Sequence, residues 1–167
     1  MKHVNTVIIG GGTAGLSMGR CLVEHSVDHV ILERGQIAER WRSERWHSLR
    51  MLTPNWQSRL PHWQYTGTDP DGFMTMSEFI DHLEAYAESY DAPVETGTTV
   101  TDVQKRSDGR FVVTTNRGIW MATNLVVATE FSICHVFRNL LRMCRRISLK
   151  LSRPNIAIQR KSPKEAS

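Results

Sequence analysis

The feature that most restricts the fold of this chain is a glycine-rich stretch near the N-terminus. Gly10, Gly12 and Gly15 have the spacing GxGxxG and directly follow the apolar run from Val4 to Ile9. Apolar residues then recur at helical spacing up to about His25, and a second β-branched run covers His29 to Glu33. Two strands joined by a helix require a parallel sheet, because a tight turn can join only antiparallel strands.

This spacing also has a chemical meaning. The first glycine permits a tight turn, the second lets the backbone approach a pyrophosphate, and the third lets the helix pack close to the sheet. The helix N-terminus, with Thr13 and Ala14, would face the phosphate charge. Glu33 lies 18 residues after Gly15, where a carboxylate that binds a ribose hydroxyl is expected. The pattern predicts a dinucleotide site. Its carboxylate would repel a 2′-phosphate, which disfavours NADP as the ligand.

A second motif overlaps the first. Residues 15–19 match GxSxG, the nucleophile elbow of hydrolases. That elbow needs its serine on the strained turn directly after a strand, whereas Ser17 falls inside the predicted helix. The hydrolase interpretation is therefore rejected.

The rest of the first 130 residues adds a helix and further strands. Residues 36–72 hold four tryptophans and three prolines without periodicity. This composition suggests an ordered loop segment, called the excursion below, that packs against something large and flat. Thr75 and Glu78 form a capping-box pattern before a helix that runs to about Tyr90. Predicted strands follow at Val94–Thr96, Val100–Lys105, Arg110–Thr115, Gly118–Ala122 and, as a separate buried strand, Leu125–Thr129. The expected fold is α/β: a Rossmann-like parallel sheet with helices plus an antiparallel three-stranded β-meander.

Charge divides the chain into two parts. Residues 1–130 hold 12 Lys/Arg and 16 Asp/Glu, whereas residues 131–167 hold 9 Lys/Arg and one acid. The excess of basic residues thus lies in residues 131–167 alone, and we expect no nucleic-acid partner. We expect residues 1–130 to form the nucleotide-binding domain and residues 131–167 a separate tail, partly helical or disordered. The tail is interpreted either as out-of-frame translation, the favoured alternative, or as a basic amphipathic segment for a membrane surface or an acidic partner.

Composition restricts the setting and the chemistry. The sequence has no signal-peptide pattern and no apolar run long enough for a membrane span, so a cytoplasmic location is expected. Three widely spaced cysteines indicate reduced thiols, and the seven histidines form no cluster, so no metal site is expected.

Four segments together resemble a known family. VIIGGGTAGLSMGRCL, ILERG, ERWRSERWHSLRMLTPNW and DPDGF are similar to the N-terminal part of FAD-dependent oxidoreductases of the flavin-containing monooxygenase type, over about residues 4–129. The resemblance implies an oxidoreductase flavoprotein that binds FAD, with NADPH as co-substrate in intact relatives.

The resemblance also implies roles for particular residues. The glycine loop, Gly10, Gly12, Thr13, Ala14 and Gly15, would lie along the FAD pyrophosphate, with Glu33 on the adenosine ribose. Arg34 would contact adenine or remain a solvated charge, Val100 would contact adenine through its backbone, Trp41 would lie close to the flavin, and Leu49–Pro54 would lie near its isoalloxazine ring. Ala128 and Thr129 would begin the second fingerprint of the family. Trp46, Trp56, Trp63 and Trp120 are interpreted as packing residues.

The pattern departs from the family at one position. Glu130 stands where the second fingerprint, Ala-Thr-Gly, has its glycine, and no second glycine loop for NADPH follows. We therefore expect an incomplete FAD-binding portion and assign no catalytic residue. The alternatives are a non-catalytic nucleotide-binding remnant or accessory module, and an NAD-binding dehydrogenase domain, which the excursion and the meander disfavour.

Overall fold

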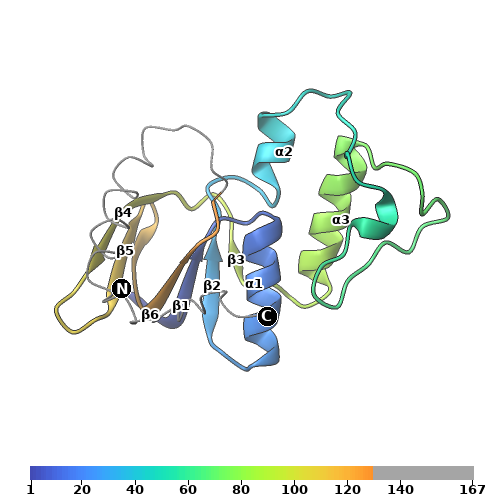
Figure 1. Ribbon diagram of the computed structural model, residues 1–167. Helices are drawn as coiled ribbons and strands as arrows, with labels where there is room; N and C mark the ends of the chain where they lie inside the picture. Colours follow the sequence, from blue (N-terminus) through green and yellow to red (C-terminus); the bar gives the residue numbers. More distant parts are fainter. Residues whose placement is uncertain (130–167) are drawn as a thin grey trace, which may run out of the picture. The chain divides into compact units, whose positions relative to one another are not determined.

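A computed structural model describes residues 1–129 of the chain (Figure 1). One mixed sheet of six strands has the order β3-β2-β1-β6-β5-β4. The strands are β1 (Lys2–Ile9), β2 (His29–Leu32), β3 (Val94–Glu95), β4 (Val100–Lys105), β5 (Phe111–Thr115) and β6 (Gly118–Val127). The helices are α1 (Thr13–Glu24), α2 (Glu39–Ser43) and α3 (Met76–Glu88), with a 3-10 turn η1 (Asn55–Gln57). The expectations for residues 131–167 lie outside the described residues.

The parallel half of the sheet confirms the predicted strand–helix–strand unit. β1 pairs in parallel with β2, from Thr6↔His29 to Ile9↔Leu32, and β2 continues in parallel to β3. Val7, Ile8 and Ile31 are fully or almost fully buried. A strand that is covered on both faces reads as a continuous apolar run, which is why these strands were visible in the sequence.

The meander is present, but its last strand is longer than predicted. Gly118–Ala122 and Leu125–Thr129 were predicted as separate strands, and this was wrong: β6 runs without a break through the exposed Thr123 and Asn124. β1 supplies the reason, because it pairs with β6 in parallel from Lys2↔Trp120 to Ile9↔Val127. The meander and the parallel strands therefore belong to one sheet, and the predicted fold class is confirmed.

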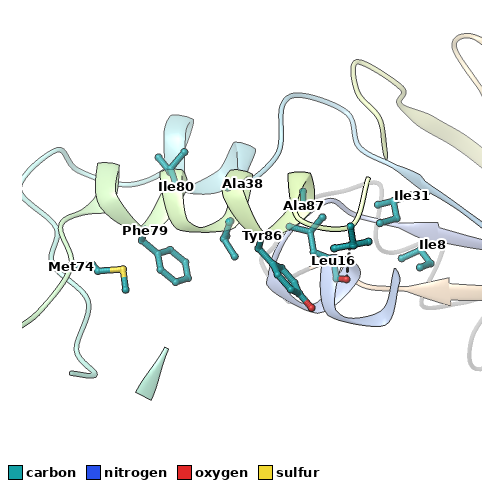
Figure 2. Packing of buried hydrophobic residues seen from close by; sticks show 11 residues of the cluster. Ile8, Leu16, Ile31, Ala38, Met74, Phe79, Ile80, Tyr86 and Ala87 are labelled. Carbon is teal, nitrogen blue, oxygen red and sulfur yellow. Dashed lines mark hydrogen bonds between the residues drawn. The ribbon is translucent and has the colours of Figure 1, made fainter. Parts of the chain in front are cut away.

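The core joins the sheet to α1 and α3. Leu16 of α1 and Leu83 of α3 are fully buried, and Tyr86 is almost so. Figure 2 shows Phe79, Tyr86 and other side chains along α3, with Leu16 and the sheet residues at one end of the cluster. Beyond α3, the Tyr90 hydroxyl donates to the carbonyl of Leu16 at 2.7 Å, which fixes the end of α3 to α1.

The excursion is ordered by backbone pairing. Residues 49–56 run beside residues 70–76, with hydrogen bonds such as Met51 N to Met74 O at 2.8 Å and Trp56 N to Pro70 O at 3.0 Å. The buried side chain of Asn55 links the two stretches, since it donates to Asp69 O at 2.9 Å and accepts from Met74 N at 2.8 Å.

The tryptophans divide into packed and exposed residues. Trp63 packs against the core cluster, and Trp120 is buried on β6, as predicted. Trp46 and Trp56 are 60% and 45% exposed, so the prediction that they pack was wrong. All four side chains are indoles, so the position of each residue in the fold determines whether its ring reaches the core.

No helix within residues 1–129 is long and apolar enough to cross a bilayer.

The capping box predicted before α3 is present, and it supports a testable expectation. Thr75 Oγ1 accepts from Glu78 N at 3.3 Å, and Glu78 Oε2 accepts from Thr75 N at 2.7 Å. Replacing Thr75 with alanine should lower the free energy of unfolding by about 1 kcal/mol, because an amide of the first turn loses its acceptor. Urea unfolding at neutral pH measures this change. Ser77→Ala, in the same turn and outside the capping box, should change stability far less.

The same bonds make stability depend on pH. Hydrogen bonds from Thr75 hold the pKa of Glu78 below its ordinary value of 4.5. The resulting stabilisation is fully present above that value and is lost as pH falls through the lower pKa of the folded state. Glu78→Gln should therefore remove part of the acid-side loss of stability in a pH series of urea melts. An unchanged pH profile would contradict this assignment.

Candidate nucleotide-binding site

The glycine loop lies at the carboxyl edge of the parallel strands, between β1 and α1. Gly10 has a φ of 113°, and its amide bonds to Leu32 O at 2.9 Å, so the first glycine makes the predicted tight turn. A Cβ on Gly15 would collide with the Gly10 carbonyl, so the third glycine permits the predicted close packing. Gly12 is different, because a Cβ there would meet no atom within 4 Å. Its backbone borders open space, where a ligand has room to approach.

The N-terminus of α1 suits an anion. Gly12 is the N-cap residue, no side chain caps this end, and the first turn contains no acidic residue. Leu16 N bonds to Gly12 O at 3.0 Å, so the amides of Thr13, Ala14 and Gly15 belong to the turn that has no intrahelical partners. Such amides and the helix dipole favour negative charge.

Glu33 lies beside this loop, just after β2, and is 8% exposed. Its Oε2 accepts from Gly11 N at 2.7 Å, and its Oε1 accepts from Gly35 N at 3.0 Å. A carboxylate has about four acceptor positions, so two backbone donors orient the group and leave capacity for further hydroxyl donors. The carboxylate is thus fixed beside the glycine loop, as its spacing predicted.

Sequence reasoning missed the partners of Glu33. A Cβ on Gly11 would lie 2.9 Å from Glu33 Cβ, so this glycine lets the carboxylate reach the loop. In the sequence Gly11 is only a fourth glycine, at the second position of GxGxxG, and the motif gives that position no role. Gly35 was also missed, because a glycine after a strand reads as an ordinary turn residue.

Ala128 and Thr129 meet the loop from the other side. Ala128 N donates to Ile9 O at 2.9 Å, and its carbonyl would lie 2.8 Å from a Cβ on Gly10. The parallel pairing of β6 with β1 brings the two ends of the domain together. The side-chain oxygen of Thr129 is buried and has no partner within residues 1–129. It is therefore a polar group at the loop with unused hydrogen-bonding capacity.

The predicted adenine-side residues flank Glu33. Thr98 N donates to Glu33 O at 2.8 Å, so the segment before β4 runs beside the end of β2. Val100 begins β4 two residues later and is partly buried. Arg34 pairs with Glu44 at 2.5 Å and is half exposed. The structure thus shows Arg34 in an exposed ion pair and Val100 in the segment that follows Thr98, and the adenine contacts of both residues remain predictions.

The proximity of Trp41 to the flavin remains a prediction, and the structure shows which residue this ring contacts. Trp41 lies on α2 and packs edge-on against Phe79 of α3, with ring centroids 4.8 Å apart. Ala38, which precedes α2, donates its amide to Gly11 O at 3.2 Å and so connects this helix to the glycine loop.

No group of three or more His, Cys, Asp or Glu side chains within residues 1–129 is arranged to hold a metal ion.

Comparison with known proteins agrees with this geometry. The profile of the pyridine nucleotide-disulphide oxidoreductase family matches residues 7–137. A CzcO-like uncharacterised oxidoreductase of Geobacillus kaustophilus is 40% identical over 77% of this chain and 37% of its own length. The indole-3-pyruvate monooxygenase YUCCA6 of Arabidopsis thaliana is 31% identical over 71% of this chain and 27% of its own length. The chain therefore spans about 37% or less of these two relatives.

Solved structures share the fold. A flavin-containing monooxygenase from Stenotrophomonas maltophilia is 30% identical, covers 77% of this chain and 39% of its own, and superposes with a TM-score of 0.68. A bacillithiol disulfide reductase from Staphylococcus aureus has a TM-score of 0.71 at 19% identity, and the match covers 78% of this chain and 39% of the reductase chain. At that identity the match shows the fold alone. The chain belongs to the pyridine nucleotide-disulphide oxidoreductase family and corresponds to the N-terminal part of its flavin-containing monooxygenase-type members.

Proposed function

We propose that this chain is the FAD-binding portion of a flavin-dependent oxidoreductase. The observation that carries the proposal is the pairing of Glu33 with the glycine loop. A carboxylate held by two backbone amides lies next to a helix N-terminus whose N-cap residue, Gly12, borders open space. One end of the site therefore suits a ribose diol and the other a pyrophosphate.

The other predicted residues have places in this proposal. Thr13, Ala14 and Gly15 would donate their amides to the pyrophosphate. Thr129, whose hydroxyl has no partner among the described residues, would donate to the cofactor from the β6 side. Val100 and Arg34 would border adenine, Arg34 only after leaving its ion pair with Glu44. Trp41, held against Phe79, would form part of the flavin-side wall. FAD would supply the redox chemistry, while these residues bind and orient it.

FAD binding is tested by reconstitution. The purified chain should become yellow after incubation with FAD and gel filtration. Glu33→Gln should weaken FAD binding by at least about tenfold, because a charge-assisted bond to a ribose hydroxyl contributes roughly 1.5–3 kcal/mol. Fluorescence quenching of FAD on binding measures the affinity.

The control is Glu88→Gln, which removes an exposed carboxylate from the end of α3. It should leave FAD affinity unchanged. Because the side-chain amide introduced by Glu33→Gln would also turn its own NH₂ group toward one backbone N–H, unfolding of each variant is measured beside binding. A folded, colourless protein that takes up no FAD would overturn the proposal.

The alternative to an enzyme is a non-catalytic FAD-binding module. The chain spans 37% of the CzcO-like relative, so the activity of a whole relative is not assigned to it. In intact relatives NADPH would serve as the co-substrate for a monooxygenase reaction on a small molecule. NADPH oxidation by the FAD-loaded chain, with and without candidate substrates, separates the two: turnover supports an enzyme, and bound FAD without turnover supports the module.

A further inference from the structure

An open cavity of about 300 Å³ lies between α3 and the loop before it, away from the glycine loop. Its apolar walls include the rings of Trp63 and Tyr65 and the side chain of Met74, and Ala85 of α3 borders it. This volume is at the lower end of the range found for small-molecule sites. The cavity is therefore large enough for one aromatic ring with a short side chain.

The aromatic wall is held in place from three directions. The ring of Trp63 packs against Tyr86, with centroids 5.9 Å apart, and its indole N–H donates to His82 Nδ1 at 3.4 Å. Leu60 and Trp63 exchange backbone hydrogen bonds of 2.9 and 3.0 Å. The Tyr86 hydroxyl donates to Pro61 O at 3.1 Å. The wall thus exists before any ligand arrives, which limits the ordering that binding would require.

The charge at this cavity has one sign. Its lining contains the carboxylates of Glu78 and Asp81, the imidazole of His82, whose pKa burial lowers, and no lysine or arginine. Glu78 is engaged in the capping box of α3, and Arg50 lies near enough to lower its pKa. Asp81 is exposed and makes no ion pair within residues 1–129. Asp81 is therefore the carboxylate that is free to bind a cation.

We propose that this cavity binds a small organic cation, a protonated amine attached to an aromatic or flat apolar body. The body would pack against Trp63, Tyr65 and Met74, and the ammonium group would lie between Asp81 and an aromatic face. Both contacts favour a cation over a neutral or anionic molecule of the same shape. The site uses none of the residues assigned to FAD, so it stands or falls independently of FAD binding.

The test is a set of matched probes with the full-length chain. Saturation-transfer NMR and titration calorimetry are carried out with 2-phenylethylammonium, 2-phenylethanol and phenylacetate. The ammonium should bind about fivefold or more tightly than the alcohol, and the anion should not bind measurably. Equal binding of all three, or no binding at millimolar concentration, would overturn the proposal.

Two variants locate the binding site. Asp81→Asn should reduce the preference for the ammonium over the alcohol, while Glu88→Gln, on the same helix but outside the lining, should preserve it. Ala85→Leu should abolish binding of both probes, because the larger side chain fills the cavity from an exposed position where leucine is a good helix former. Binding that survives in folded Ala85→Leu would place the cation elsewhere and refute the assignment.

Discussion

Replacing Gly15 with alanine is expected to lower the free energy of unfolding by about 2 kcal/mol or more and to displace the glycine loop. A Cβ at this position points into the Gly10 carbonyl, with Ala128 Cβ 3.5 Å away on the second side. Backbone atoms have no rotamer through which to move aside, so the clash must be relieved by shifting α1 away from β1. Overpacking of this kind costs roughly 1–3 kcal/mol, which exceeds the ~1 kcal/mol that alanine gains over glycine in a helix. Urea unfolding followed by circular dichroism measures the change.

Gly12→Ala is the matched control, because it adds the same methyl group three residues earlier. Gly12 has φ −92° and ψ −170°, an extended conformation that alanine adopts, and the added Cβ would meet no atom within 4 Å. Its stability should fall by no more than about 1 kcal/mol, the usual cost of alanine as an N-cap residue. FAD affinity should nevertheless fall, because the methyl group would occupy the space proposed for the pyrophosphate. Equal destabilisation by both substitutions would contradict this account of the loop.

The sequence predicted the parallel part of the fold because its signals are local. A buried strand, a glycine turn, an amphipathic helix and a second buried strand can each be read from neighbouring residues. The same reasoning failed at β6, where Thr123 and Asn124 interrupt the apolar run. The strand continues because β1 offers a parallel partner, with Asn124 opposite Thr6 and its side chain donating to Asn5 at 3.0 Å. A partner more than a hundred residues away leaves no local trace.

The candidate site was predictable to the same degree. Glu33 could be placed from its spacing, since parallel strands bring their carboxyl ends to one edge. Gly11 could not be recognised, because its requirement comes from contact with Glu33, a long-range feature. The exposure of Trp46 and Trp56 was unpredictable for a similar reason. Aromatic composition shows that a segment has rings to bury but not which rings the loop path carries to the core.

Replacing Asn55 with alanine is the second large expected effect. Its buried amide donates to Asp69 O and accepts from Met74 N, and so joins the two stretches of the excursion. Without it, the buried Met74 amide loses its acceptor. We expect the free energy of unfolding to fall by about 3 kcal/mol, from two hydrogen bonds and one unsatisfied donor. Thermal and urea unfolding measure the loss, and amide hydrogen exchange at Met74 should accelerate.

Asn116→Ala separates burial from hydrogen-bond number. Asn116 also bridges two backbone groups, because its Oδ1 accepts from Thr99 N at 2.8 Å and its Nδ2 donates to Gly97 O at 3.2 Å. Asn116 is exposed, so water replaces both partners, and the loss should be no more than about 1 kcal/mol. The difference between the two variants therefore reports the cost of leaving a polar group unsatisfied in the interior. If both variants lose the same stability, then Asn55 contributes only its bonds, and the excursion is less tightly packed around it than its burial indicates.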